Sequence, residues 1–179
     1  MAKDSSSGGE KSWRRATRLV RGGTARSSHG ETSEAMFLTS GYVYDGPAEA
    51  EARFKGEAPG FVYSRFGNPT VAMFEQRLAL LEGAEACKVT STGMAAVFAS
   101  LMAQLRAGDH VVASRALFGS CLYIVSDLLP RYGIEVTLVD GTDLAQWQAA
   151  FRPETRCVFL ESPSNPTLEI IDVRAVSAL

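Results

Sequence analysis

From residue 68 onward, the apolar positions of the chain alternate between two spacings. Apolar residues three or four positions apart between 71 and 81 predict a helix, which Asn68 caps and Gly83 ends. The same spacing predicts further helices over 94–105, about 121–132 and 144–151. Between the helices, short apolar runs predict buried strands at 86–90, 110–113, 134–139 and 156–160.

The spacing of the strands predicts the fold class. They begin at residues 86, 110, 134 and 156, which leaves room for one crossover helix between successive strands. Such alternation is typical of an α/β domain whose mostly parallel sheet carries helices on both faces. We assign this domain to residues 68–179. Its last predicted helix begins after Asp172 and reaches only its second turn at Leu179, so we expect the domain to be truncated here.

The first 67 residues lack this periodicity. Residues 31–67 show little clear pattern, and we expect them to form an extended arm. Residues 1–30 hold seven Lys or Arg and two Asp or Glu among many Ser and Gly, which predicts a mobile basic terminus. No aromatic-interleaved patch or reading helix accompanies the charge, so we expect no nucleic-acid partner.

Composition narrows the class of protein. Hydrophobic residues make up 46% and charged residues 21% of the chain, which are ordinary values for a globular domain. The longest apolar run, 94–103, is too short to span a membrane, and the first residues lack the apolar segment of a secretory signal. We therefore expect a cytoplasmic protein with no membrane partner. The three cysteines and two histidines are isolated, which argues against a disulfide framework and a metal site.

Candidate chemistry lies where the predicted strands end, because ligands of α/β sheets collect at the carboxyl ends of strands. The amides of Gly93 and Met94 and the hydroxyl of Thr92 lie at a predicted helix start, where they would meet a phosphate. An ordinary capped core helix is the alternative. Phe118 follows the next strand and would either stack on a planar cofactor or belong to the core.

Two further stretches carry polar side chains beside prolines. In the loop 161–166, two prolines would aim Glu161 and Asn165, although a plain rigid loop is the alternative. Tyr63 and Arg65 precede the first predicted helix of the domain, and an arginine beside a tyrosine in this position suits a phosphate. A solvated surface arginine is the alternative there.

Five motifs from these stretches occur in order: Tyr63-Ser-Arg65-Phe-Gly-Asn68-Pro69-Thr70, Leu81-Glu-Gly83, Ser91-Thr-Gly93-Met94-Ala-Ala, Gly108-Asp109-His-Val-Val and Glu161-Ser-Pro163-Ser-Asn165-Pro166. Together they resemble the cystathionine γ-synthase-like enzymes, the Cys/Met-metabolism group of pyridoxal-phosphate enzymes, over about residues 19–179. The resemblance implies pyridoxal 5'-phosphate as cofactor. It also implies the large domain of the aspartate-aminotransferase-type fold (PLP fold type I), here truncated.

The resemblance further implies which residues hold the cofactor phosphate. The amides of Gly93 and Met94, beside Thr92, would bind it within the subunit. Tyr63 and Arg65 would reach into a neighbouring subunit and clamp the phosphate there. The resemblance therefore implies a homo-oligomer with shared active sites, in which the arm contacts the neighbouring subunit. A homotetramer is the form expected from the resemblance, although the sequence does not fix the number of subunits.

The resemblance assigns the remaining candidates to the cofactor ring and the substrate. Phe118 would stack on the pyridine ring, and Glu161 and Asn165 would line the cofactor and substrate pocket. Most of the family has Tyr at position 118, whereas a sulfide-using branch commonly has Phe; the stretches 21–27 and 31–41 also look most like that branch. The implied reaction is a γ-replacement that converts O-succinylhomoserine and sulfide to homocysteine and succinate. The expected partners are therefore small molecules, an O-acyl-homoserine and sulfide.

The family's Schiff-base lysine is not among the motifs. The lysines of the chain are Lys3, Lys11, Lys55 and Lys88, and none has the family's Ser-x-Thr-Lys setting. We expect that lysine beyond Leu179, so we assign no catalytic residue and expect the chain to be inactive alone. The alternatives are a cystathionine γ-synthase or γ-lyase of the same family, or a non-catalytic fragment that only binds phosphate or pairs with other subunits.

Overall fold

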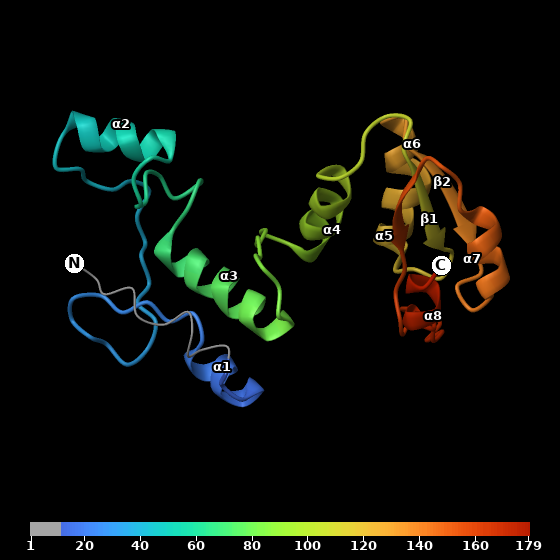
Figure 1. Ribbon diagram of the computed structural model, residues 1–179, viewed down its shortest axis with the longest axis horizontal. Coiled ribbons are helices and arrows are strands. Elements are labelled where there is room, and N and C mark those ends of the chain that lie inside the picture. The colour runs from blue at the N-terminus through green and yellow to red at the C-terminus, as the bar shows by residue number, and fades with distance from the viewer. Residues whose placement is uncertain (1–11) are drawn as a thin grey trace. The chain divides into compact units, whose positions relative to one another are not determined.

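The computed structural model describes residues 12–179 of the 179-residue chain as two compact units (Figure 1). The N-terminal unit ends at Val89, and the C-terminal unit comprises Thr90–Leu179. The predicted mobile terminus falls partly on residues 1–11, which lie outside the described residues.

From residue 12 onward, the N-terminal unit contains the α-helices α1 (Arg15–Arg21), α2 (Pro47–Lys55) and α3 (Pro69–Glu82). The structure confirms α3 with both of its predicted ends. The side chain of Asn68 accepts a hydrogen bond from the Thr70 amide at 2.9 Å. Gly83 ends the helix in the left-handed conformation, at a φ of 67°, which glycine adopts without strain.

The apolar periodicity does not predict α1 or α2. For α2 the signal lies in composition, because alanine and glutamate favour helices and two glutamates precede basic residues by four positions. Both pairs form ion pairs of 2.5 Å, Glu49 with Arg53 and Glu51 with Lys55. The expected extended arm therefore includes one helix.

The loop after α1 is bound to α3. Arg77 of α3 donates hydrogen bonds to the carbonyl of Gly22 at 2.8 Å and to the hydroxyl of Thr24 at 3.0 Å. A Cβ atom on Gly23, whose φ is 71°, would lie 2.8 Å from a carbonyl oxygen of α3, so glycine is required at this close approach. In the structure, residues 22–24 of the terminus predicted to be mobile thus contact α3.

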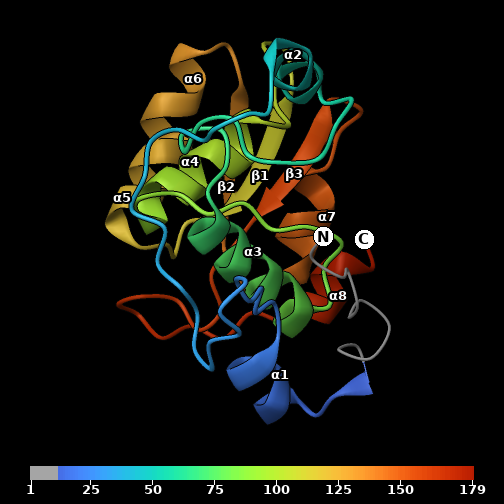
Figure 2. The ribbon, with the colours of Figure 1, turned by 90° about the vertical axis from the view of Figure 1, so that its left-hand side faces the viewer.

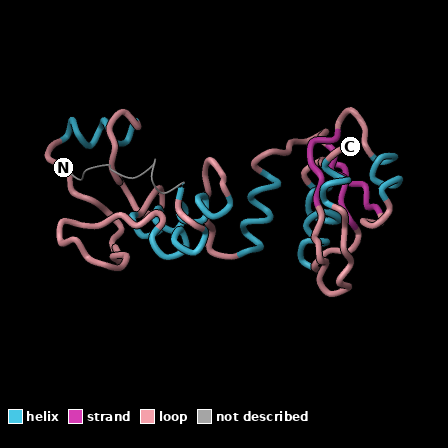
Figure 3. The backbone as a smooth tube through the Cα atoms, turned by 60° about the horizontal axis from the view of Figure 1, so that its bottom comes forward, coloured by secondary structure: helices cyan, strands magenta, loops and turns pink. Residues whose placement is uncertain are grey.

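A carboxylate extends the same connection along the arm. Arg77 also pairs with Glu34, and Thr24 donates to that carboxylate at 3.1 Å. These bonds lower the pKa of Glu34 to about 2, with the Arg77 hydrogen bond as the main cause. The long loops of this unit, visible in Figure 3, are thus held to α3 by side-chain contacts rather than by a sheet.

The C-terminal unit contains a parallel three-stranded sheet in the order β2–β1–β3. The strands are β1 (His110–Ser114), β2 (Glu135–Val139) and β3 (Thr155–Phe159). The helices are α4 (Gly93–Met102), α5 (Gly119–Tyr123), η2 (Ile124–Leu128), α6 (Leu129–Arg131), α7 (Leu144–Ala150) and α8 (Val173–Ser177). The elements α5, η2 and α6 follow without a break and form the single helix predicted near 121–132; η2 is a π-helical segment within it. The predicted α/β class with a parallel sheet is confirmed.

Helices cover both faces of this sheet, with α4, α5 and α6 on one side and α7 and α8 on the other (Figure 2). Val111 of β1 packs with Leu101 of α4 and Leu129 of α6. Its neighbour Val112 points to the opposite face and packs with the fully buried Trp147 of α7. Because successive strand residues face opposite sides, a sheet covered twice needs such continuous apolar runs.

The strand predicted at 86–90 is wrong, because this segment is a loop. A strand needs a hydrogen-bonded neighbour, and the strands that the structure describes pair with one another. The segment is instead held by Glu75 of α3, which accepts from the Val89 amide at 3.1 Å and binds the Lys88 ammonium at 3.0 Å. The boundary between units accordingly follows Val89, and α3 belongs to the N-terminal unit.

Candidate active site

The turn before α4 presents unpaired backbone donors. Thr92 caps the helix: its Oγ1 accepts from the Ala95 amide and its carbonyl from the Ala96 amide, each at 3.1 Å. The amides of Gly93 and Met94 are the first two of the helix and so have no acceptor within it. The space where a Cβ of Gly93 would stand is open to 4 Å. This helix start therefore suits an anion, to which the Thr92 hydroxyl can still donate its proton.

Phe118 lies beyond the carboxyl end of β1 and immediately before α5. The residue is 43% exposed, so Phe118 does not belong to the buried core. The backbone amide of Phe118 is bound, donating to Oε2 of Glu161 at 2.8 Å. The main chain at this position is thus fixed while the ring faces outward.

Glu161 connects the loops that follow β1 and β3. Its second oxygen, Oε1, accepts a hydrogen bond from the Asn165 amide at 3.0 Å. Two of the candidate residues predicted from separate stretches, Phe118 and Asn165, are therefore brought to a single carboxylate. Both follow the carboxyl ends of neighbouring parallel strands, where α/β proteins bind their ligands.

The loop that carries Asn165 is closed on itself by serine side chains. Ser162 Oγ accepts from the Ile171 amide at 2.9 Å, and Ser164 Oγ accepts from the Glu169 amide at 2.9 Å. Ser164 is fully buried, and its own amide donates to the Glu169 carbonyl at 3.0 Å. This network fixes the main chain at Asn165, whose side chain is exposed.

Tyr63 and Arg65 lie in the N-terminal unit, on a turn before α3. The Tyr63 carbonyl accepts the amides of Phe66 and Gly67, at 2.9 and 3.1 Å. The Arg65 guanidinium lies 5.4 Å from the Tyr63 ring centroid and 5.2 Å from that of Phe66. Among the described residues, no carboxylate forms an ion pair with Arg65, so its charge is available to an anion.

Ser64 and Asn68 fix this turn against the arm. The Ser64 amide donates to the Ser40 carbonyl at 2.9 Å, and the Asn68 amide group donates to the Phe37 carbonyl at 2.9 Å. Gly41 and Tyr63 form a β-bridge beside these bonds. The arm therefore supports the loop that presents Tyr63 and Arg65.

The nucleophilic side chains near these stretches are engaged or protonated. Burial, together with the charge of Glu161, raises the pKa of Cys121 in α5, which keeps its thiol protonated at neutral pH. Lys88 is bound to Glu75 in the N-terminal unit. Neither residue acquires a new chemical role from the structure.

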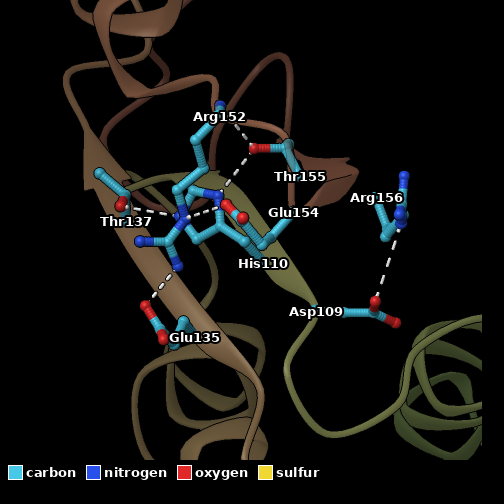
Figure 4. Close-up of polar contacts among 8 residues, drawn as sticks. All are labelled: Asp109, His110, Glu135, Thr137, Arg152, Glu154, Thr155 and Arg156. Carbon is cyan, nitrogen blue, oxygen red and sulfur yellow. Dashed lines mark hydrogen bonds and ion pairs between the residues drawn. The ribbon is translucent and has the colours of Figure 1, made fainter.

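His110, taken as isolated in the sequence, is a connected and buried residue at the amino end of β1 (Figure 4). Its Nδ1 lies 2.8 Å from the Thr155 hydroxyl of β3, and its Nε2 lies 2.8 Å from the Thr137 hydroxyl of β2. Burial, and then the charge of Arg152, lowers the pKa of His110. His110 lies at the amino end of the strands, whereas Glu161 follows their carboxyl ends. We therefore assign His110 a structural role in the sheet and leave it out of the candidate site.

Two other kinds of site are absent from residues 12–179. No cluster of His, Cys, Asp or Glu there has the arrangement of a metal centre. No helix in the same range combines the length and apolar character needed to cross a bilayer.

With this geometry described, comparison with known proteins decides the family. The sequence profile of the Cys/Met metabolism PLP-dependent enzymes matches residues 16–179. The chain belongs to this family. The cofactor of the Cys/Met metabolism enzymes is pyridoxal 5'-phosphate, and the implied fold type I large domain is confirmed by solved relatives.

Relatives of this chain include O-succinylhomoserine sulfhydrylases and L-methionine gamma-lyases. The chain is 56% identical to the O-succinylhomoserine sulfhydrylase of Mycobacterium tuberculosis over 92% of its length, and 47% identical to that of Pseudomonas aeruginosa over 91%. An L-methionine gamma-lyase of Porphyromonas gingivalis is 39% identical over 90% of the chain. In each case the chain spans about 40% of the length of the relative.

A solved structure shows the same fold with the cofactor attached. The putative O-acetylhomoserine (thiol)-lyase of Campylobacter jejuni carries N'-pyridoxyl-lysine-5'-monophosphate and matches with a TM-score of 0.86 and 30% identity. The match covers 93% of this chain and 41% of that one. Family and fold therefore agree.

The residues of this chain fit such a cofactor. The open helix start at Gly93 offers two free amides and suits a phosphate. The half-exposed ring of Phe118 suits a planar heterocycle. The helix start can therefore hold the phosphate of pyridoxal phosphate, and the aromatic ring can contact its pyridine ring.

Proposed function

We propose that the intact protein catalyses a γ-replacement that converts O-succinylhomoserine and sulfide to homocysteine and succinate. The observation that carries the proposal is the 56% identity to an O-succinylhomoserine sulfhydrylase over nearly the whole of this chain. Phe118, the residue expected in the sulfide-using branch, supports the same assignment. Because the chain spans about 40% of that relative, the activity is proposed for the whole protein.

In this proposal the phosphate is held at two places. The amides of Gly93 and Met94 and the hydroxyl of Thr92 bind it at the start of α4, where the helix dipole favours the anion. Tyr63 and Arg65 serve a neighbouring subunit, because their turn presents an unpaired guanidinium and an exposed ring. A homo-oligomer with shared sites follows from this assignment.

The ring and the substrate are oriented from the carboxyl ends of β1 and β3. Pyridoxal phosphate, when bound, supplies the electron sink that makes the α- and β-carbon protons of the substrate acidic. Phe118 stacks on the ring and Asn165 lines the pocket beside it. Phe118 has no hydroxyl, so it orients the ring and moves no proton.

A product assay on the intact protein tests the proposal. We expect homocysteine and succinate in equal amounts from O-succinylhomoserine and sulfide. Cysteine in place of sulfide would be a poor nucleophile, with less than about a tenth of the kcat/KM, because a nucleophile pocket discriminates by a few kcal/mol. Failure to release succinate in the presence of sulfide would contradict the assignment.

A second candidate is γ-elimination. The 39% identity to an L-methionine gamma-lyase of Porphyromonas gingivalis favours it. Formation of 2-oxobutanoate and ammonia from methionine at a rate above that of γ-replacement would establish the lyase, whereas cystathionine formed preferentially from cysteine would establish a cystathionine γ-synthase.

A further inference from the structure

Glu161 uses both carboxylate oxygens on the main chain of the site. Oε2 accepts from the Phe118 amide at 2.8 Å, and Oε1 accepts from the Asn165 amide at 3.0 Å. The first of these residues follows β1 and the second follows β3, and the two strands are direct neighbours in the sheet. One side chain therefore sets the spacing of two loops.

The charge of Glu161 matches its place at a helix start. Phe118 is the N-cap of α5, and its own side chain makes no capping hydrogen bond. An uncapped helix start has unpaired amides and a positive end of the helix dipole. Glu161 supplies the missing acceptor from the loop after β3, and the helical run 119–131 makes a carboxylate favourable there.

The hydrogen bonds to Glu161 are made by the backbone of Phe118 and Asn165, so the side chains of both residues remain available to a ligand. The Phe118 ring is half-exposed, and within residues 12–179 no hydrogen bond from the Asn165 side chain is seen. In both residues the backbone is restrained and the side chain is presented outward. Glu161 can therefore fix the positions of the Phe118 ring and the Asn165 carboxamide without itself contacting the ligand that they bind.

We propose that Glu161 is a positioning residue, which acts on the cofactor through Phe118 and Asn165 and contacts neither cofactor nor substrate. This inference rests on the proposed function and replaces the expectation that Glu161 lines the substrate pocket. Its carboxylate keeps the ring of Phe118 at a fixed angle and distance from the carboxamide of Asn165. Orientation of this kind contributes to the rate more than to substrate affinity.

The test compares Glu161→Gln with Glu169→Gln in the intact protein. The glutamine side chain of the first variant retains one oxygen but turns an NH2 group toward an amide donor, so one of the two bonds is lost. Glu169 lies in the same loop, its hydrogen bonds with Ser164 are made by its backbone, and its substitution removes the same charge. Glu161→Asp, which keeps the carboxylate on a shorter chain, serves as the conservative variant.

Three measurements separate positioning from the other roles. We expect Glu161→Gln to raise amide hydrogen exchange at Phe118 or Asn165 of the cofactor-free protein by roughly tenfold, the effect of one lost hydrogen bond. The induced circular dichroism of bound pyridoxal phosphate should change, because ring geometry changes. The kcat should fall by about tenfold to a hundredfold while KM for the acyl-homoserine changes by less than about threefold.

Two outcomes would overturn the proposal. A raised KM with unchanged exchange means that Glu161 binds substrate directly. Faster exchange with unchanged dichroism and kcat means that Glu161 only holds the loops. Partial rescue by Glu161→Asp with no effect of Glu169→Gln supports positioning. If the wild-type protein releases no succinate, the proposed reaction fails, but the exchange and dichroism measurements still decide the role of Glu161.

Discussion

The two ends of the parallel sheet are both connected across strands by one ionisable side chain, with opposite results. At the amino end, buried His110 bonds with the hydroxyls of Thr137 and Thr155, so side chains satisfy side chains. At the carboxyl end, Glu161 bonds with the backbone amides of Phe118 and Asn165 and leaves their side chains exposed. The first arrangement pairs buried side chains with one another, whereas the second leaves two side chains exposed where we propose that the cofactor binds. In this proposal, residues that stabilise the sheet and residues that bind a ligand lie at opposite ends of the strands.

We expect the largest effect on stability from His110→Ala, which removes the hydrogen bonds at the amino end of the sheet. The variant should lose about 2–4 kcal/mol in the free energy of unfolding, because a buried ring is removed and two hydroxyls lose their partner. The measurement is urea unfolding of the intact protein. Specific activity per folded molecule should stay at the wild-type value, and a variant that is stable but inactive would show that the two ends are coupled.

The next effect concerns Gly141, which follows β2. A Cβ there would lie 2.4 Å from Cδ1 of Ile171 and 2.6 Å from Oγ of Ser114. We expect Gly141→Ala to reduce the free energy of unfolding by about 1–3 kcal/mol through overpacking. Gly119→Ala, where a Cβ meets nothing within 4 Å, should change it by less than about 0.5 kcal/mol. Equal effects in both variants would contradict this packing argument.

The third prediction concerns Phe118→Ala, at the carboxyl end of the sheet. Loss of the stacking ring should weaken pyridoxal phosphate binding by roughly threefold to tenfold, measured by equilibrium titration. The free energy of unfolding without cofactor should fall by no more than about 1 kcal/mol, because the ring is already half-exposed. Phe118→Tyr keeps the ring and should bind like wild type. A large loss of stability with unchanged cofactor affinity would assign Phe118 to the core instead.

The smallest effect is the pH dependence of the amino end. The pKa of His110 is lowered in the folded state from 6.5, chiefly by burial and then by Arg152, while Glu135 and Glu154 partly oppose the shift. The unfolded chain therefore binds a proton more readily, and stability falls as pH drops below about 6.5. His110→Gln should show a smaller loss between pH 7.5 and about 5.5 in urea unfolding. Parallel curves for the two proteins would show that His110 does not titrate between the two states.

Local pattern was sufficient for much of the fold. The caps Asn68 and Gly83, the three paired strands and the helices between them follow from periodicity and end signals within a few residues. The false strand at 86–90 shows the limit of this reasoning. Its apolar character is local, but strand formation depends on a partner, and here Glu75 of α3 holds the segment instead.

The candidate site divides in the same way between sequence and tertiary structure. The sequence determined its chemical groups: a glycine helix start at 93, a ring at 118 and polar residues at 161 and 165, each recognisable from its neighbours. Only the fold decided that Glu161 bonds across 43 residues to the Phe118 amide, and that His110 joins Thr137 and Thr155 across 27 and 45. Caps and periodicities depend on contacts within a few turns of the chain. These bonds instead exist because parallel strands bring residues that are distant in the sequence to the same end of the sheet.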